Sequence, residues 1–476
     1  MVGQSTASTE SSIYDDDSAG GKGVIRIAAV AALGGFLFGY DSAVINGAVS
    51  AVERQFNVES ALLGFAVASA LLGAAAGALT SGRIADRIGR LAVMKIAAIL
   101  FLVSAIGSGF ANSLTTLIVF RIVGGVGVGM ASVIAPAYIA EISPARIRGR
   151  LASLQQLAIV TGIFISLLVD FIFATLAGGS SEPFWFGLPA WRWMFLAMAV
   201  PAVIYGLLSF TIPESPRFLI SKHKVTAATA ILTRLLGETN IELKIKRIRE
   251  SMERETDPSW RDLKNPSGKI AGIVWIGLLL SVFQQFVGIN VIFYYSNVLW
   301  EAVGFDESQA FTITVISAVI NILTTLIAIG TIDKFGRKPL LIIGSIGMTV
   351  TLATMAIVFG TARVVDGNPV LSGAQGPIAL VAANLFVISF GMSWGPVTWV
   401  LLGEMFPNRM RAAALSVAAG GQWVANWLIT VTFPGLKDVS LALAYGLYAA
   451  FALLSFLFVM KFIAETKGKQ LEDMEG

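Results

Sequence analysis

Two charged side chains lie inside long apolar stretches of this sequence. Asp41 follows Phe38-Gly39-Tyr40, and Arg121 lies near the start of another apolar stretch. A charge at the centre of a membrane helix costs about 2.5–3.5 kcal/mol on insertion, so such residues usually have a function. If the two stretches cross a membrane in opposite directions, the rise of about 1.5 Å per residue puts both charges at similar depth. We therefore expect Asp41 and Arg121 to pair.

This pair has the chemistry of a proton-binding site. Arg121 favours the ionised form of Asp41, whereas burial in apolar surroundings favours the protonated form. The single histidine, His223, lies in a charged loop, so no apolar stretch contains an imidazole. The sequence thus predicts Asp41 as the proton-carrying group and Arg121 as its partner. A static structural ion pair is the alternative.

Isolated amides and tryptophans interrupt several other apolar stretches. An amide donates and accepts hydrogen bonds at one site, which matches the hydroxyls of an uncharged sugar. Aromatic rings can cover the apolar face of a pyranose, and the lack of fixed charge argues against an ionic substrate. Hydrogen bonding between membrane helices is the alternative role. The residues are Gln155, Gln156, Gln284, Gln285, Asn290, Asn321, Trp394, Gln422, Trp423 and Asn426.

The composition requires that these residues be held in a membrane. Apolar residues make up 55% of the 476 residues and charged residues only 13%, against about 25% charged in an ordinary soluble domain. A spanning helix needs roughly 20 apolar residues, and these runs are longer than the alternating segments of a membrane barrel. We predict an all-α membrane protein with twelve spans, at 24–48, 60–80, 92–110, 116–139, 151–173, 190–212, 271–300, 309–331, 339–361, 378–402, 411–434 and 438–463.

The spans divide into two halves of six, joined by a polar segment. We predict a disordered tail (1–23), an N-terminal half (24–212), a linker with short helices (213–270), a C-terminal half (271–463) and a second tail (464–476). All but five of the 34 basic residues fall on one side of the predicted membrane. Because cytoplasmic loops carry the excess of Lys and Arg, we expect both tails and the linker to be cytoplasmic.

Charged motifs repeat at matching places in the two halves. Parallel half-repeats joined by a linker are the organisation of the major facilitator fold. Acids and arginines at these helix ends could form an ion-pair network between the halves that holds a cytoplasmic gate shut in one state and separates in the other. Setting helix orientation is the alternative role. The predicted gate residues are Asp86, Arg87, Arg90, Glu141, Arg148, Glu214, Asp333, Arg337, Glu404, Arg411 and Glu465.

Other functions find little support in the sequence. There is no cysteine, so disulfides and thiolate metal sites are excluded. The glycines at 124, 125, 127 and 129 follow no strand, and no phosphate-binding loop motif occurs. No catalytic grouping is present. We expect no enzyme activity, no metal, no organic cofactor and no nucleic-acid partner, and the lipid bilayer as surroundings.

Several motifs resemble those of the sugar porter family of the major facilitator superfamily, over about residues 24 to 470. They include Gly34-Gly35-Phe-Leu-Phe38-Gly39-Tyr40-Asp41, the Glu141 and Glu404 repeats, Pro213-Glu214-Ser215-Pro216-Arg217 and Gln284-Gln285-Phe-Val-Gly288-Ile289-Asn290. The resemblance is closest to bacterial glucose permeases.

The resemblance implies roles for individual residues. An acid at Asp41, working with Arg121, implies proton symport, because passive facilitators of the family have asparagine there. Ile163 and Phe293 match glucose carriers rather than xylose carriers, and with Phe38 and Trp423 they would shape the pocket. The implied sugar contacts are Gln156, Gln284, Gln285, Asn290, Asn321, Trp394 and Gln422.

We therefore expect a secondary active transporter of the cell membrane. It would take up a hexose, most simply D-glucose, together with a proton through alternating access, acting as a monomer. The alternatives are a passive sugar facilitator, a proton symporter for xylose, galactose or a polyol, and a membrane sugar sensor that binds without transport.

Overall fold

The computed structural model describes residues 21–143, 148–236, 241–254, 263–265, 268–365, 368–407 and 410–466. Most of the predicted N-terminal tail (1–23) and C-terminal tail (464–476) lies outside these residues. The predicted linker (213–270) is described in part.

Nearly all of the described chain is helical. The first half contains α2 (Gly21–Ala43), α3 (Ile45–Phe56), α4 (Ser60–Ile88), α5 (Arg90–Gly109), α6 (Leu114–Ile142), α7 (Arg148–Ala177), the short 3-10 helix η1 (Trp185–Gly187), α8 (Ala190–Ala197) and α9 (Ala199–Leu208). The linker contains α10 (Pro216–Ser221), α11 (Val225–Leu236) and α12 (Ile241–Arg254).

The second half repeats this helical pattern and adds a small hairpin. Its elements are α13 (Gly272–Phe286), α14 (Ile289–Tyr294), α15 (Ser296–Ala302), α16 (Glu307–Phe335), α17 (Arg337–Thr361), β1 (Arg363–Val365), β2 (Asn368–Val370), α18 (Gln375–Gly391), α19 (Trp394–Met405), α20 (Arg411–Val439) and α21 (Leu441–Phe462). The two strands pair antiparallel, with Val364 opposite Pro369.

Eleven helical segments of the described residues are long and apolar enough to cross a membrane. The twelfth predicted span, 411–434, lies in α20, a continuous helix of 29 residues. Gln422, Trp423 and Asn426 interrupt its apolar sequence. The twelve-span, all-α prediction is confirmed, and the polar residues of α20 explain why composition alone finds one span fewer.

Several predicted spans are broken helices rather than single rods. The first predicted span, 24–48, is too short, because α2 and α3 together run to Phe56. The predicted span 271–300 consists of three helices. Its first break is at Gly288, where φ is +84° and an added Cβ atom would lie 2.8 Å from the ring of Tyr448. Glycine is the residue that adopts this conformation without steric cost.

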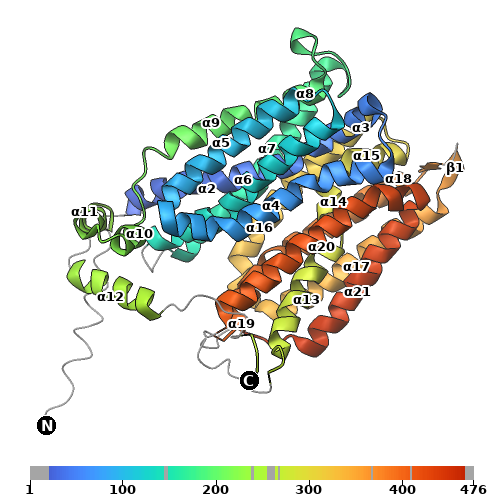
Figure 1. Cartoon of the computed structure of the whole chain (residues 1–476). Helices are drawn as coiled ribbons and strands as arrows, with labels where there is room; N and C mark the ends of the chain where they lie inside the picture. Colours follow the sequence, from blue (N-terminus) through green and yellow to red (C-terminus); the bar gives the residue numbers. More distant parts are fainter. Residues whose placement is uncertain are drawn as a thin grey trace.

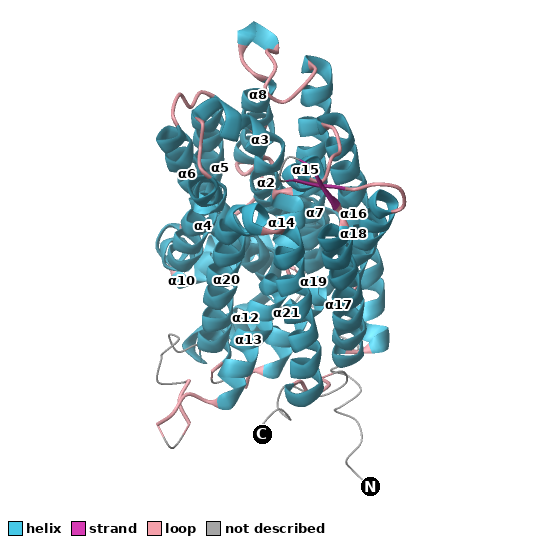
Figure 2. Cartoon of the chain, turned by 90° about the vertical axis from the view of Figure 1, so that its right-hand side faces the viewer, coloured by secondary structure: helices cyan, strands magenta, loops and turns pink. Residues whose placement is uncertain are grey.

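The two halves lie side by side (Figure 1). Helices α2 to α9 form one group and α13 to α21 the other, and the groups meet where α4 packs on α20 and α7 packs on α16. The linker helices α10 to α12 lie at one end of the bundle, which we call the linker end. Helices α3, α8 and α15 and the β1–β2 hairpin lie at the opposite end, the hairpin end (Figures 1 and 2).

The outer surface of the bundle is apolar, while polar groups lie inside. Leu79, Ile343 and Val424 are each about two-thirds exposed or more, and Asp41, Arg121 and Asp170 are buried. A water-soluble protein shows the opposite distribution of charge. The chain is therefore a multi-pass membrane protein, and its polar interior marks the place to look for function.

Candidate functional site

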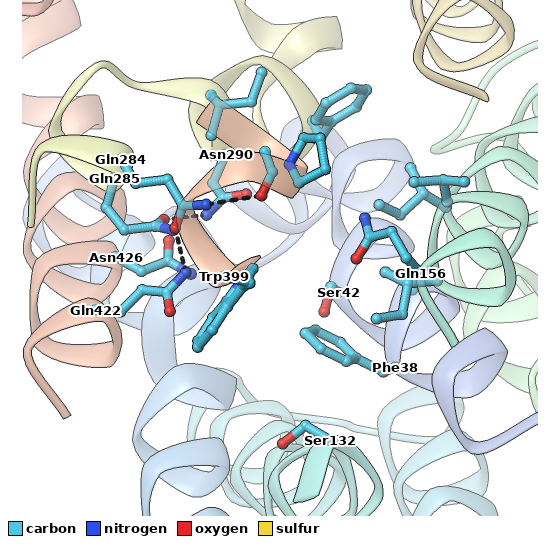
Figure 3. A pocket seen from close by; sticks show the side chains of 18 of the residues that line it. Phe38, Ser42, Ser132, Gln156, Gln284, Gln285, Asn290, Trp399, Gln422 and Asn426 are labelled. Atoms are coloured by element: carbon cyan, nitrogen blue, oxygen red, sulfur yellow. Dashed lines mark hydrogen bonds between the residues drawn. The ribbon is translucent and has the colours of Figure 1, made fainter. Parts of the chain in front are cut away.

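A cavity of about 580 Å³ lies between the two halves. This volume is within the usual range of small-molecule sites, roughly 300–1,000 Å³. Helices α2, α4, α6 and α7 contribute to one wall, and α13, α14, α16, α18, α19 and α20 contribute to the other. Amide side chains line the second wall, and Phe38, Ser42 and Gln156 face them across the cavity (Figure 3).

Four predicted sugar contacts form one hydrogen-bonded network. Gln422 Nε2 donates to Gln284 Oε1 at 2.5 Å, and Gln285 Nε2 donates to the same oxygen at 3.4 Å. Asn290 Nδ2 donates to Gln285 Oε1 at 2.6 Å. Gln284 Nε2 donates to the Trp394 carbonyl at 2.9 Å. The network holds the amides in place while leaving donors and acceptors for the hydroxyls of a ligand.

The break at Gly288 is what brings Gln285 and Asn290 together. On an unbroken helix, residues five apart point about 140° away from each other. Here α13 ends at Phe286 and α14 begins at Ile289, so the two side chains face the same cavity and bond directly. The expectation that Gly288 would allow this is confirmed.

Apart from Trp394, the remaining predicted lining residues also lie at the cavity. Gln156 comes from α7 and Asn321 from α16. The Phe38 and Trp423 rings, one from each half, have centroids 6.3 Å apart. The predicted shape-determining residues Phe38, Ile163, Phe293 and Trp423 all line the cavity.

Trp394 is a correction to the predicted set. Its side chain is fully buried behind the cavity wall, and its Nε1 donates to the Leu341 carbonyl at 3.1 Å and to Ser345 Oγ at 2.9 Å. The tryptophan that lines the cavity is Trp399, five residues further along α19. A five-residue step changes the helix face by about 140°, and the sequence alone did not indicate which face of α19 points inward.

The predicted pair of Asp41 and Arg121 is confirmed. Arg121 Nη1 lies 3.4 Å from Asp41 Oδ2, and both side chains are at most 2% exposed. The same nitrogen donates to the Asp41 main-chain carbonyl at 2.8 Å. Neither carboxyl oxygen of Asp41 has a hydrogen-bond partner. The carboxyl group is thus held beside a cation without being fixed by hydrogen bonds.

Two residues connect this ion pair with the cavity. A small space beside the pair is lined by Asp41, Arg121, Ser42 and Tyr294. Ser42 and Tyr294 also line the main cavity. Sequence analysis did not single out either residue, because an isolated serine or tyrosine in an apolar helix carries no distinctive signal.

Among the described residues, the charged repeats form matching ion-pair networks inside each half. The predicted network between the halves, which would form when the cytoplasmic gate closes, stays a prediction. Arg90 Nη2 lies 3.0 Å from Glu141 Oε1, and Arg337 Nη2 lies 2.7 Å from Glu404 Oε1. Gly89 and Gly336, both with positive φ, precede these arginines and let each begin a new helix close to the glutamate of its own half.

The other predicted gate residues extend these networks or lie apart from them. Glu214 accepts from the Arg90 amide and Glu465 from the Arg337 amide, at 3.1 and 3.0 Å. Asp86 lies 3.0 Å from Arg90, Arg87 is exposed, and Arg411 donates to the Phe406 carbonyl. The side chains of Arg148 and Asp333 lie outside the described residues.

The halves contact each other through polar groups at the hairpin end. Asn46 Oδ1 accepts a hydrogen bond from the main-chain amide of Asn297 at 3.1 Å. Ser50 Oγ donates to Glu301 at 3.2 Å, and Arg54 Nη2 lies 3.5 Å from the same carboxylate. Together these contacts join α3 to α15 and close the molecule at this end.

A helical bundle of two repeated halves, with a polar cavity at their interface and charges buried beside it, defines a membrane carrier. Residues 27–476 match the family described as "Sugar (and other) transporter". The chain belongs to this family.

Individual relatives match over almost the whole chain. A glucose transport protein of Synechocystis sp. is 56% identical over 98% of this chain and 99% of its own length. A D-xylose-proton symporter of Escherichia coli is 39% identical over 95% of each chain. The inward open structure of the xylose transporter XylE from E. coli matches with a TM-score of 0.81 at 38% identity, covering 95% of this chain and 99% of that one.

Proposed function

We propose that this chain is a proton-coupled sugar carrier of the cell membrane, with D-glucose as its sugar. The observation that carries the proposal is the Asp41–Arg121 pair, buried at 3.4 Å and joined to an amide-lined cavity through Ser42 and Tyr294. The 56% identity to a glucose transport protein supports glucose. The matching of a proton symporter at 39% identity supports coupling to protons.

The cavity chemistry fits an uncharged hexose. Gln156, Gln284, Gln285, Asn290, Asn321 and Gln422 would donate to and accept from the sugar hydroxyls. The rings of Phe38, Phe293, Trp399 and Trp423 would cover its apolar faces. We assign the four aromatic rings to shape selection and the amides to binding, with Ile163 limiting the space beside them.

The proton would act on the ion pair. Protonation of Asp41 removes the negative charge that holds Arg121, and the freed guanidinium is 5.9 Å from the Phe195 ring, which can accept a cation at this distance. Ser42 and Tyr294 line both spaces, so a change at the pair alters one end of the sugar cavity. The coupling ion is the proton, and no organic cofactor takes part.

The access cycle follows from the contacts between the halves. With α3 and α15 joined at the hairpin end, this state would open toward the linker end, and the match to the inward open conformation of XylE supports that direction. We place the linker end and both termini in the cytoplasm because Lys and Arg concentrate there. One chain supplies the whole cavity, so a monomer suffices for transport.

The function is tested by measuring labelled D-glucose uptake into vesicles that contain the protein. An imposed pH gradient, acidic on the hairpin side, should raise the glucose concentration on the opposite side above that on the hairpin side. A protonophore should abolish this accumulation. Uptake that ignores the gradient would indicate a passive facilitator. Uptake of labelled xylose, galactose or a polyol in place of glucose would be consistent with proton symport but would show that D-glucose is not the substrate.

A further inference from the structure

Asp170 is a second carboxyl group buried in the membrane-spanning part of the chain. Its side chain in α7 is fully buried, and neither carboxyl oxygen has a hydrogen-bond partner. It faces α3 at a close contact, where a Cβ atom added to Gly47 would lie 2.7 Å from Asp170 Oδ2. The Gly47 amide approaches the carboxyl group without reaching hydrogen-bond geometry.

Asp170 lacks the cation that Asp41 has. Arg121 lies 3.4 Å from Asp41, whereas within the described parts of the chain no lysine or arginine forms an ion pair with Asp170. An ionised carboxylate that is buried without a partner is so unfavourable that the group takes up a proton instead. The surroundings of Asp170 therefore favour its neutral, protonated form.

The charged and titratable groups on the helices packed against α7 are engaged elsewhere. Tyr40 on α2 is a phenol, so it supplies no cation to Asp170. Tyr40 donates to the Met194 carbonyl, and Arg121 on α6 pairs with Asp41. Arg192 on α8 donates to the Gly109 carbonyl, and Glu307 on α16 accepts from the Ser180 amide. On α3, Arg54 pairs with Glu301, and Glu53 is partly exposed.

A hydroxyl accompanies the carboxyl group on α7. Ser166 precedes Asp170 by four residues, so the two side chains are neighbours on one helix face. Ser166 is fully buried, and its hydroxyl also has no hydrogen-bond partner. The contact between α3 and α7 thus contains a small polar patch that apolar packing alone would not require.

The patch lies next to the contacts that close the hairpin end. Asn46, adjacent to Gly47, bonds to the Asn297 amide across the two halves. Ser50 and Arg54 on the same helix contact Glu301. Helix α3 continues from α2 through Val44, whose φ of −56° and ψ of −29° remain helical. Opening of the hairpin end would uncover the side of α3 that faces α15 and give water a path to the Asp170 carboxyl group beside Gly47.

We propose that Asp170 is a second proton-binding site of the carrier. It holds a proton while the hairpin end is closed, and it releases that proton to water when α3 moves and the carboxyl group becomes hydrated. The proposal deepens the proposed proton-coupled function, since it gives the transport cycle a protonation step besides the one at Asp41. No bond other than the O–H bond forms or breaks.

Infrared spectroscopy of the protein in lipid vesicles tests the protonation state directly. A protonated carboxyl group has a C=O stretch that is distinct from the bands of a carboxylate. We expect the wild type and the Ser166→Ala control to share a component of this band at neutral pH that is missing from the spectrum of Asp170→Asn. If Asp170→Asn does not fold, Asp170→Glu should shift the band. A spectrum that neither substitution changes would overturn the proposal.

The role of Asp170 protonation in the transport cycle is tested by the exchange of labelled glucose across the vesicle membrane. This exchange is measured at equal pH on both sides and needs no gradient. We expect exchange by the wild type to fall as the pH rises, and to fall at least threefold less in Asp170→Asn, because an amide cannot ionise. Equal falls in both would contradict a role in transport. A complete lack of glucose exchange by the wild type would refute the proposed function instead. The infrared band would then still show whether Asp170 is protonated.

Discussion

At the scale of single residues, position on a helix face decides which polar side chains meet the ligand. Gln284 lies at the centre of the amide network, with bonds to Gln422, Gln285 and the Trp394 carbonyl. Trp394 and Trp399 lie on the same short helix, yet one supports the wall from behind and the other faces the cavity. The two tryptophans should therefore respond differently to substitution.

Trp399→Ala should weaken glucose binding by about tenfold, since aromatic contacts contribute about 0.5–1.5 kcal/mol beyond the area they bury. Trp394→Phe should leave affinity within about twofold but lower the thermal stability, because losing the indole donor costs about 1–3 kcal/mol when its acceptors stay buried. Glucose affinity measured by calorimetry, which does not rely on tryptophan fluorescence, and melting temperatures together check both effects. Equal loss of affinity in the two variants would contradict the assignment.

The sequence predicted the Asp41–Arg121 pair because two rare charges had matching depths in neighbouring spans. It also predicted the amides of the cavity, because their polarity stands out in apolar helices. It failed at Trp394, since the rotation of a short helix depends on where the chain breaks. In α19 that break is at Ser393, which has φ −133° and ψ −90°. Asp170 was not singled out because it lies only three residues before the end of the predicted span 151–173. Its burial without a partner is visible only in three dimensions.

At the scale of elements, broken helices build the cavity. The interruption at Gly288 turns α14 away from α13 and aligns Gln285 with Asn290 at 2.6 Å. The close approach of the Tyr448 ring leaves no room for a side chain at position 288. The carrier thus depends on a backbone feature as much as on the amides themselves.

Gly288→Ala should reduce both stability and glucose binding. A non-glycine residue in the left-handed conformation costs about 1–2 kcal/mol, and the added methyl group also displaces Tyr448. Gly446→Ala in α21, where an added Cβ meets nothing within 4 Å, is the matched control. Melting temperature and glucose affinity should fall in the first variant and stay near wild type in the second; similar behaviour of the two would contradict this account of the break.

The α3–α15 contact at the hairpin end should depend on pH through Glu301. Burial, assisted by the negative charge of Glu307, raises the pKa of Glu301 to about 7. A hydrated glutamate in the open state has a pKa of about 4.3. The closed state therefore binds this proton more tightly, so its stabilisation is full below the lower pKa and is lost as the pH rises through 7.

Thiol labelling can measure this pH dependence, because the chain contains no cysteine. Val298 on α15 lies beside Ser50 and Arg54 of α3 and is 7% exposed, so a Val298→Cys variant should react mainly when the hairpin end opens. After correction for the titration of the thiol itself, reactivity should rise as the pH passes 7. Adding Glu301→Gln should remove that rise. A rise that persists with the glutamine would exclude Glu301 as its source.

The charged repeats were visible in the sequence, whereas their ion pairs inside each half were not. Glu141 and Glu404 follow equivalent spans, which revealed the internal repeat. Whether each would pair with its own half or with the other depends on the turns at Gly89 and Gly336, whose positive φ angles direct Arg90 and Arg337 back to the same half. A pattern of charges along the chain contains no information about these turns.

At the scale of the whole molecule, two halves with their own ion-pair networks move around one shared cavity. The contacts between the halves at the hairpin end are separate polar contacts, which also include Ser180 with Glu307 and Ser60 with Asp438. Exposed or partly exposed ion pairs are worth only about 0–1 kcal/mol each. Such contacts can open without disrupting either half. Sugar and proton would then be carried together because their sites share Ser42 and Tyr294.

The most direct test of this account compares the wild type with Asp41→Asn in vesicles under an inward pH gradient. With one proton per sugar, a gradient of one pH unit corresponds to about 1.4 kcal/mol and supports up to about tenfold accumulation of glucose. We predict accumulation in the wild type, and in Asp41→Asn only equilibration together with continued exchange of labelled glucose. Accumulation by Asp41→Asn to the wild-type level, or its absence in both proteins, would contradict proton coupling through Asp41.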